Sequence, residues 1–165
     1  MPFKILTVCT GNICRSPSAE VILRDHLAAA GLGDLVEVDS AGTADYHIGE
    51  PPSDPAMRLG AQRGYDLSPL RARQITAADF DAFDLILVMD RGHLDRLSAL
   101  QPAGAKASVR LFLDLMPPAG AKGAGAEVAD PYYGGDADYA AMFDVIEAAV
   151  PSWIAHLQGS LRGPA

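Results

Sequence analysis

A cysteine and an arginine near the start of the chain have the spacing of a nucleophile and a phosphate clamp. Cys9 is followed by five residues and then by Arg15. The planar guanidinium of an arginine can hold two oxygens of a phosphate at once. Gly11 and Asn12, which lie between them, tolerate the positive φ angles that a tight loop needs. A thiolate facing a bound phosphate is a nucleophile directed at phosphorus, so Cys9 is a candidate for nucleophilic catalysis.

The flanking sequence predicts the elements that hold this loop. Phe3–Val8 is an apolar run typical of a buried strand. Ser16 and Pro17 are a strong helix-start signal, because serine can cap free N–H groups and proline suits the first helical position. The helix that follows presents one apolar face, made of Ala19, Ile22, Leu23, Leu27 and Ala30. A loop on a helix N-terminus binds anions and favours a thiolate, so we expect the backbone N–H groups of residues 10–16 to hold phosphate.

A second stretch, near residue 130, offers an acid and aromatic side chains. Removing phosphate from a phenol requires a proton for the leaving oxygen, and Asp130 can supply it from a loop stiffened by Pro131. On its own such an aspartate more often just caps a turn. Tyr132 and Tyr133 are either core residues or the walls of a slot for a flat ring, and Tyr46 offers the same choice. If Asp130 is buried near phosphate, activity should peak on the acid side of neutral pH.

These stretches together resemble the low-molecular-weight protein tyrosine phosphatases. The resemblance is carried by Cys9–Pro17, Ser40–Thr43 and Asp130–Gly134, and it extends to the C-terminal helix. It implies that the enzyme hydrolyses phosphotyrosine on proteins through a phosphocysteine intermediate. It also implies that neither a metal nor a cofactor is needed.

The resemblance assigns roles to individual residues. Cys9 is the expected nucleophile, Arg15 the phosphate clamp, and Asp130 the general acid and then the general base. The residues expected to bind substrate are Thr10, Gly11, Asn12, Ile13, Cys14, Ser16, Tyr46, Tyr132 and Tyr133.

Two positions favour phosphotyrosine over other substrates. Ile13 resembles the tyrosine-specific members, whereas relatives acting on phosphoarginine tend to carry threonine there and phenylalanine at the position of Tyr132. A protein arginine phosphatase is therefore the first alternative. The second is an arsenate reductase of the same fold, which needs further cysteines beyond Cys14. A phosphotyrosine-binding module without catalysis would have lost the nucleophile or the acid, and this chain retains both.

Three polar residues match family positions that support the loop through hydrogen bonds. They are Asn12, Ser16 and Ser40, and Ser16 can donate to the Cys9 thiolate as well as cap the helix. A histidine seen near this network in several relatives is replaced here by Pro69. The sequence therefore does not predict which residues contact the outer side of this network.

The sequence allows two roles for Cys14. It is either a small apolar residue of the loop or a redox partner that forms a reversible disulfide with Cys9, as in some relatives. The four histidines are scattered, and we expect each to be a surface or packing residue, with His47 at the presumed rim as the one to watch.

The rest of the chain alternates predicted strands and helices. Strands are expected at Val36–Ser40, Leu85–Met89 and Val109–Leu113. Helices are expected from Ser53 to about Gln62 and from Arg91 to Leu100. A last helix is expected from about Asp136, with a kink or restart at Pro151. Leu115–Ala129 is expected to be a long loop. This order predicts a four-stranded parallel sheet in a flavodoxin-like, doubly wound three-layer αβα fold, with Cys9 at the carboxyl end of the first strand. We expect one phosphatase domain over residues 1–158 and a frayed tail over 159–165.

Charge and composition limit the partners. The formal net charge is −8, so nucleic acid is not expected, and no apolar run is long enough to indicate a membrane span. The start of the chain resembles a strand and not a secretory signal, so a cytoplasmic location is expected. The expected partners are tyrosine-phosphorylated proteins, phosphate-like anions in the site, and a tyrosine kinase. Oligomeric state and any phosphorylation of Tyr132 or Tyr133 are left open.

Overall fold

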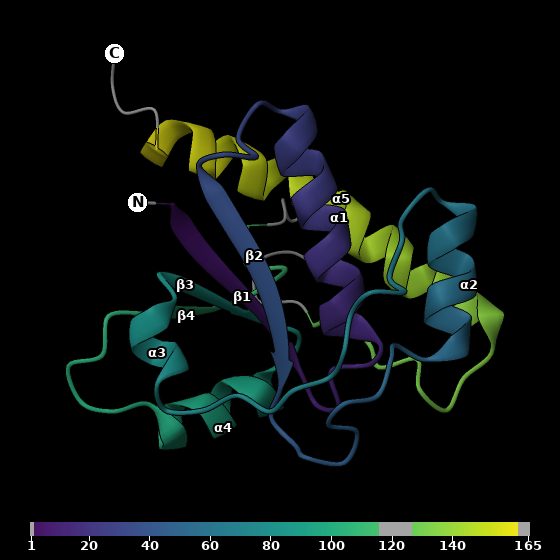
Figure 1. The fold of residues 1–165 in the computed structure, drawn as a ribbon, viewed down its shortest axis with the longest axis horizontal. Coiled ribbons are helices and arrows are strands. Elements are labelled where there is room, and N and C mark those ends of the chain that lie inside the picture. The colour runs from purple at the N-terminus through teal and green to yellow at the C-terminus, as the bar shows by residue number, and fades with distance from the viewer. Residues whose placement is uncertain (1, 116–126, 162–165) are drawn as a thin grey trace.

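The protein is a parallel sheet with helices on both faces (Figure 1). The computed structural model describes residues 2–115 and 127–161. Its elements in chain order are β1 (Phe3–Cys9), α1 (Arg15–Ala29), β2 (Val36–Gly42), α2 (Asp54–Gln62), α3 (Asp79–Ala82), β3 (Leu85–Val88), α4 (Arg91–Leu100), β4 (Ser108–Leu111) and α5 (Asp136–Leu161). Within these residues the strand order is β2-β1-β3-β4, and every pair is parallel. The predicted doubly wound α/β fold is confirmed.

The two central strands separate two hydrophobic cores. In β1, Ile5 packs into one core while Leu6 and Val8 pack into the other. In β3, Leu87 packs into the same core as Ile5, and Ile86 packs into the same core as Leu6 and Val8. Successive side chains of a strand point to opposite faces, so a strand covered on both sides must be apolar along its whole length.

The helices cover the two faces unequally. Figure 1 shows α1 and α5 on one face of the sheet and α3 and α4 on the other, with α2 beside α5. On the α1–α5 side, Trp153 is fully buried and its indole N–H donates to the carbonyl oxygen of Phe112 at 2.7 Å. This buried contact fixes the last helix against the segment that follows β4.

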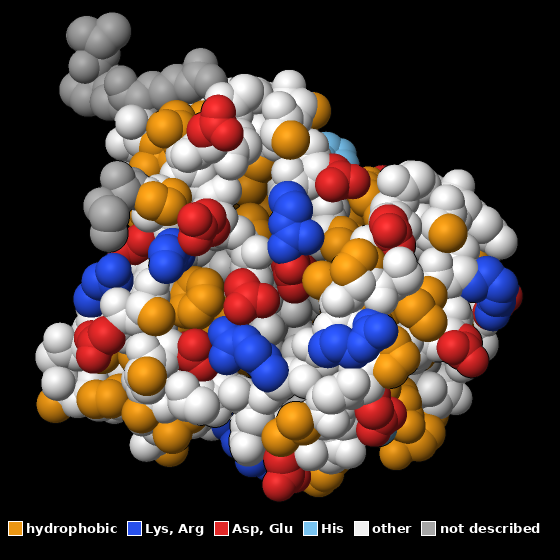
Figure 2. Space-filling view, viewed as in Figure 1, with side chains coloured by type: hydrophobic (Ala, Val, Ile, Leu, Met, Phe, Trp, Pro, Cys, Tyr) orange, Lys and Arg blue, Asp and Glu red, His pale blue; other side chains and the backbone are white. Residues whose placement is uncertain are grey.

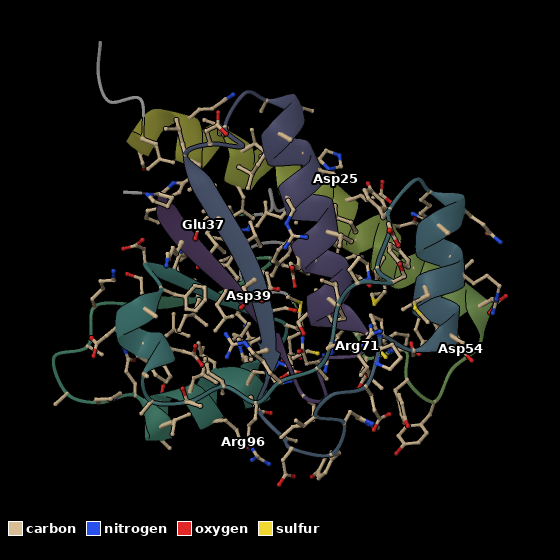
Figure 3. All side chains as sticks on the ribbon, viewed as in Figure 1. Asp25, Glu37, Asp39, Asp54, Arg71 and Arg96 are labelled. Carbon is tan, nitrogen blue, oxygen red and sulfur yellow. The ribbon has the colours of Figure 1, made fainter. Side chains whose placement is uncertain are left out.

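Charged side chains lie along the outer strand β2 and are mixed over the surface. Glu37 and Asp39 are exposed and project from β2 in Figure 3, whereas Val36 and Val38 are buried. Figure 2 shows acidic and basic side chains interspersed on the same face. No helix in the described ranges is long and apolar enough to cross a membrane.

Several local predictions need correction. The short helix α3 was not predicted. Of the two outcomes predicted for Pro151, a kink or a restart, the restart does not occur, because α5 is assigned as one helix from Asp136 to Leu161. The fourth strand spans Ser108–Leu111, so it ends earlier than expected. The last turn of α5 reaches Leu161, within the expected tail, and residues 162–165 lie outside the described part. Most of the predicted loop after Leu115 also lies outside it, in residues 116–126.

Candidate active site

The loop between β1 and α1 is anchored by its carbonyl groups. The carbonyl oxygens of Cys9 and Thr10 accept hydrogen bonds from the N–H groups of Thr43 and Ala44, at 2.9 and 3.0 Å, and that of Ile13 accepts from Ser53 at 2.8 Å. In a trans peptide the N–H points away from the C=O of the same unit. The N–H groups that follow these three carbonyls therefore face away from the supporting loops.

Two residues give the loop its tight curvature. Asn12 has a φ of 59°, in the left-handed region that asparagine tolerates better than most residues. Gly42 at the end of β2 lies directly against the loop, and a Cβ atom there would be 2.5 Å from the carbonyl oxygen of Thr10. Only glycine fits at this approach, so the backbone of β2 acts as a wall for the loop.

Cys9 lies at the base of the loop within hydrogen-bonding distance of a serine. Its Sγ is 3.0 Å from Ser16 Oγ, and only 3% of the residue is exposed. Ser16 was predicted to cap α1, but it lies in the first turn of the helix and Cys14 occupies the N-cap position without a side-chain cap bond. The other role predicted for Ser16, a contact with Cys9, is present, and its hydroxyl also donates to the carbonyl oxygen of Ala41 at 3.3 Å.

A buried chain of hydrogen bonds holds Ser16 in place. The Nδ2 amide of Asn12 donates to Ser16 Oγ at 2.8 Å and to Ser40 Oγ at 2.9 Å. Ser40 in turn donates to Glu20 Oε1 at 2.7 Å, and the backbone N–H of Arg73 donates to Asn12 Oδ1 at 3.0 Å. Glu20 and the backbone of Arg73 thus supply the outer contacts of this network, which could not be predicted from the sequence. Burial raises the pKa of Glu20.

Arg15 is buried and held from behind by two oxygen atoms. Its Nη1 donates to Asp90 Oδ2 at 2.9 Å and to the carbonyl oxygen of Val128 at 2.9 Å. Burial works to raise the pKa of Asp90, but hydrogen bonds from Arg15 and from the backbone of His93 hold it below its usual value. Asp90 caps α4, and it also fixes the guanidinium of Arg15.

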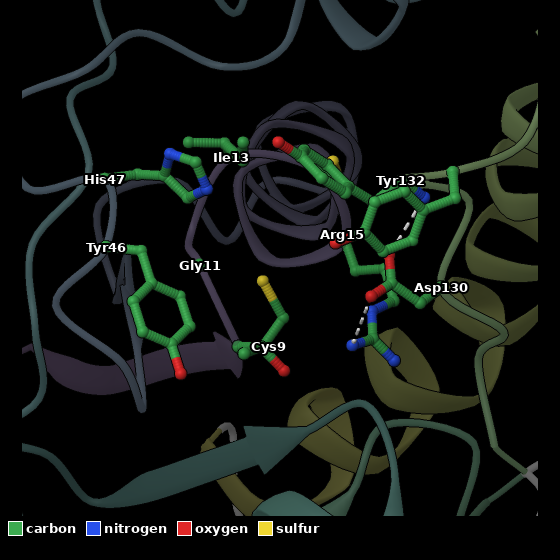
Figure 4. A pocket seen from close by; sticks show the side chains of 11 residues that line it. Cys9, Gly11, Ile13, Arg15, Tyr46, His47, Asp130 and Tyr132 are labelled. Carbon is green, nitrogen blue, oxygen red and sulfur yellow. Dashed lines mark hydrogen bonds and ion pairs between the residues drawn. The ribbon is translucent and has the colours of Figure 1, made fainter.

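Asp130 faces Arg15 from the edge of the site. Its Oδ2 lies 3.6 Å from Arg15 Nη2, and its Oδ1 accepts a hydrogen bond from the backbone N–H of Tyr132 at 3.1 Å (Figure 4). The side chain is 49% exposed. The condition set for an activity optimum on the acid side of neutral, a buried Asp130, is therefore not met, because the loop containing Pro131 presents the carboxylate at the mouth of the pocket.

The loop opens into a cavity of about 330 Å³ with aromatic walls. Tyr46 and His47 stand on one side and Tyr132 on the other, and Figure 4 shows their rings around the opening above Cys9. The ring centroids of His47 and Tyr132 are 5.9 Å apart. Tyr133 also lines the cavity but is 97% exposed. His47, expected only as a residue to watch at the rim, is thus part of the cavity wall.

The second cysteine is turned toward α5. Cys14 Sγ lies 3.3 Å from the hydroxyl of Tyr139 and 3.5 Å from that of Ser53. Both cysteines are free thiols in this structure. Burial raises the pKa of Cys14 and also that of Tyr139.

One residue beside the loop, His93, was not predicted to belong to the site. His93 was expected to be a surface or packing residue, but its Nε2 lies 2.9 Å from Thr10 Oγ1 and 3.5 Å from Arg15 Nη2. The available signal was its spacing from Asp90. A cap residue directly after a predicted strand, with a hydrogen-bonding side chain three residues later, marks a helix start at the carboxyl edge of the sheet.

The fold and this loop define an α/β protein with an anion site at the carboxyl ends of parallel strands. The family model described as low molecular weight phosphotyrosine protein phosphatase matches residues 4–162. The low molecular weight protein-tyrosine-phosphatase of Streptomyces coelicolor is 39% identical over 165 residues, which make up 100% of this chain and 99% of that protein.

Solved structures agree with this match. A protein tyrosine phosphatase from Entamoeba histolytica, crystallised with Hepes in the active site, has a TM-score of 0.88 and 32% identity, covering 96% of this chain and 99% of that one. A Drosophila arginine phosphatase has a TM-score of 0.84 and 28% identity, covering 95% and 99%. The chain belongs to the low-molecular-weight protein tyrosine phosphatase family and is an enzyme of that class, a protein tyrosine phosphatase.

Proposed function

We propose that this enzyme hydrolyses phosphotyrosine on proteins through a phosphocysteine intermediate. The observation that carries the proposal is the convergence of Cys9, Arg15 and Asp130 on one cavity, with Asp130 only 3.6 Å from the guanidinium of Arg15. The backbone N–H groups of residues 10–16 and Arg15 would hold the phosphoryl oxygens as negative charge shifts during transfer.

In the first step, Cys9 attacks phosphorus in line with the leaving phenol. The S–P bond forms as the bond between phosphorus and the tyrosine oxygen breaks. Asp130 starts in its protonated form and gives its proton to that oxygen. Its position at the mouth of the cavity suits this role, because the leaving group must point outward from the loop.

In the second step, water hydrolyses the phosphocysteine. Asp130, now ionised, accepts a proton from the water as its oxygen attacks phosphorus, and the thiolate of Cys9 leaves. Ser16, 3.0 Å from the sulfur, would stabilise the thiolate that is regenerated.

The substrate class is proposed from the walls of the cavity. Tyr46, His47 and Tyr132 form a slot suited to a flat ring, and Ile13 lines the same cavity with an apolar surface. The likeness to the Drosophila arginine phosphatase makes phosphoarginine the second candidate substrate. Ile13 argues against it, because a threonine at this position would favour phosphoarginine. An arsenate reductase would need a cysteine beyond Cys14, and the sequence contains two cysteines in all.

The remaining partners follow from this chemistry. The substrates are tyrosine-phosphorylated proteins, and a tyrosine kinase must produce them. We propose that the enzyme works in the cytoplasm, where a reducing environment would keep Cys9 and Cys14 as thiols.

The test is phosphate release from matched peptides carrying phosphotyrosine, phosphoarginine or phosphoserine, with EDTA present throughout. Wild-type enzyme is expected to prefer phosphotyrosine, and Cys9→Ser is expected to release none while keeping the wild-type melting temperature. Preference for phosphoarginine would overturn the substrate assignment. Activity retained in Cys9→Ser would overturn the mechanism.

A further inference from the structure

His93 is a buried histidine that the mechanism above does not use. It is 3% exposed and lies in the first turn of α4. Its backbone N–H donates to Asp90 Oδ1 at 3.0 Å, and its Nδ1 accepts from the backbone N–H of Asp90 at 3.3 Å. These two bonds form a reciprocal cap of the helix. Because Nδ1 is an acceptor, the proton of the neutral ring is on Nε2.

The protonated nitrogen points at the anion loop. Nε2 lies 2.9 Å from Thr10 Oγ1 and donates to that hydroxyl. It also lies 3.5 Å from Arg15 Nη2, but with the proton on Nε2 both nitrogens are donors, so this is a packing contact and not a hydrogen bond. Thr10 directly follows the nucleophile, and Arg15 is the clamp. The same imidazole therefore contacts the loop next to Cys9 and the guanidinium that would hold phosphate.

The surroundings keep this ring neutral. The pKa of His93 is lowered to about 4, first by burial and then by the positive charges of Arg15 and Arg96, against the opposite pull of Asp90 and Asp130. These groups come from α1, from α4 and its cap, and from the Asp130 loop. A neutral ring retains one acceptor and one donor, which are the two roles that its contacts require.

We propose that His93 is a positioning residue of the phosphatase, which couples the start of α4 to Thr10 and Arg15 and so holds the anion loop and its clamp in the geometry that binds the phosphoryl group. This inference rests on the proposed function for its kinetic consequences. Asp90 fixes Nη1 of Arg15 by a hydrogen bond, whereas the His93 ring only packs against the other terminal nitrogen while it holds Thr10 by a hydrogen bond. Small displacements of such groups are costly, because transition-state binding depends on their alignment.

The geometry also separates this role from helix capping. Capping uses only Nδ1, whereas the contacts with Thr10 and Arg15 use Nε2. An asparagine side chain places an oxygen near the position of Nδ1 but does not reach Thr10. A glutamine side chain places an amide nitrogen near the position of Nε2. His93→Asn and His93→Gln are therefore a matched pair that keep one function each.

The experiment measures kcat and KM with an aryl phosphate, and the affinity for inorganic phosphate by calorimetry in the Cys9→Ser background. The variants are His93→Asn, His93→Gln, Thr10→Val and the double variant His93→Asn with Thr10→Val. We expect His93→Asn to lower kcat/KM and phosphate affinity about tenfold or more. His93→Gln should recover most of both. Thr10→Val should also lower both, and the double variant should be no worse than His93→Asn alone.

A melting temperature is measured for each variant. Wild-type kcat/KM and phosphate affinity in His93→Asn, with or without a lower melting temperature, would overturn the proposal and leave His93 as a cap alone. Additive losses in the double variant would also overturn it. If His93→Asn does not fold, a loss of phosphate affinity in Thr10→Val supports the proposal, and an unchanged affinity overturns it. Phosphate binding requires no turnover, so failure of wild type on phosphotyrosine would overturn the proposed function separately.

Discussion

The hydroxyl oxygen of Ser16 lies 3.0 Å from the Sγ of Cys9, and the side-chain amide of Asn12 donates to the same oxygen from 2.8 Å. Because Asn12 supplies one hydrogen bond to the oxygen, the hydroxyl of Ser16 has one hydrogen left to donate, and its two acceptors are the Cys9 sulfur and, at 3.3 Å, the carbonyl oxygen of Ala41. When Cys9 is a thiolate, its negative charge makes the sulfur the stronger acceptor. Of the two roles predicted for Ser16, the contact with Cys9 is therefore present and the helix cap is not. This relationship leads directly to the first prediction.

Replacing Ser16 by alanine should make Cys9 less reactive. A hydrogen bond to a charged group contributes about 1.5–3 kcal/mol, which corresponds to a fall of roughly tenfold to a hundredfold in kcat and in the rate of alkylation by iodoacetamide. Ser18→Ala is the matched control, since the hydroxyl of Ser18 bonds the carbonyl of Cys14 within α1. Equal alkylation rates in Ser16→Ala and wild type would contradict the prediction.

Replacing Asp130 by asparagine should produce a defect that depends on the leaving group. Loss of a general acid costs about 10²–10⁴-fold when the leaving oxygen needs a proton, and less when the phenol is acidic. We therefore expect a large loss of kcat with phenyl phosphate and a smaller one with p-nitrophenyl phosphate. Asp136→Asn, which removes an exposed partner of Arg58, is the control. The same loss with both esters would indicate a different role for Asp130.

Replacing Gly42 by alanine should damage both stability and activity. The added Cβ would meet the carbonyl oxygen of Thr10 at 2.5 Å, and neither backbone can move freely in the packed edge of the sheet. We expect a loss of about 2–3 kcal/mol in the free energy of unfolding, measured by urea denaturation, together with weaker phosphate binding. Gly159→Ala in α5 is the control, because nothing lies within 4 Å of its added Cβ. A Gly42→Ala variant as stable as wild type would show that the loop can yield.

The burial of His93 should make stability depend on pH. Its pKa is about 4 in the folded protein and 6.5 in the unfolded chain. Between these values the unfolded state binds more protons, so the free energy of unfolding should rise with pH across this window and reach its full value above pH 6.5. With a pKa shift of this size, His93 should make the free energy of unfolding about 3 kcal/mol higher above pH 6.5 than below pH 4.

The measurement compares wild type with His93→Gln by urea denaturation at pH 5 and pH 7. The comparison with a variant is needed because the raised pKa of Glu20 acts in the opposite sense, giving stability that is lost as pH rises. Wild type should lose more stability than His93→Gln on going from pH 7 to pH 5. Equal losses in the two proteins would mean that His93 protonates in the folded state as easily as in the unfolded chain.

The sequence by itself determined the fold class and the central loop of this protein. Local backbone preferences and hydrophobic periodicity can be predicted from neighbouring residues. Such local patterns include the apolar runs of β1 and β3, the glycine and asparagine between Cys9 and Arg15, and the cap of α4 by Asp90. Cys9 and Arg15 were identified from their types and their spacing, and Asp130 was identified through the resemblance to the phosphatase family.

Only the tertiary structure decided which side chains support these groups. Arg15 is held by Asp90 and by the carbonyl of Val128, which lie 75 and 113 residues further along the chain. The contact between His93 and Thr10 also joins residues that lie far apart in the sequence. The exposure of Asp130 at the mouth of the pocket is likewise decided by the tertiary structure. Parallel strands bring all their carboxyl ends to one edge of the sheet, so loops far apart in sequence meet there. Which of their side chains touch depends on register and packing, and no single stretch of sequence contains that information.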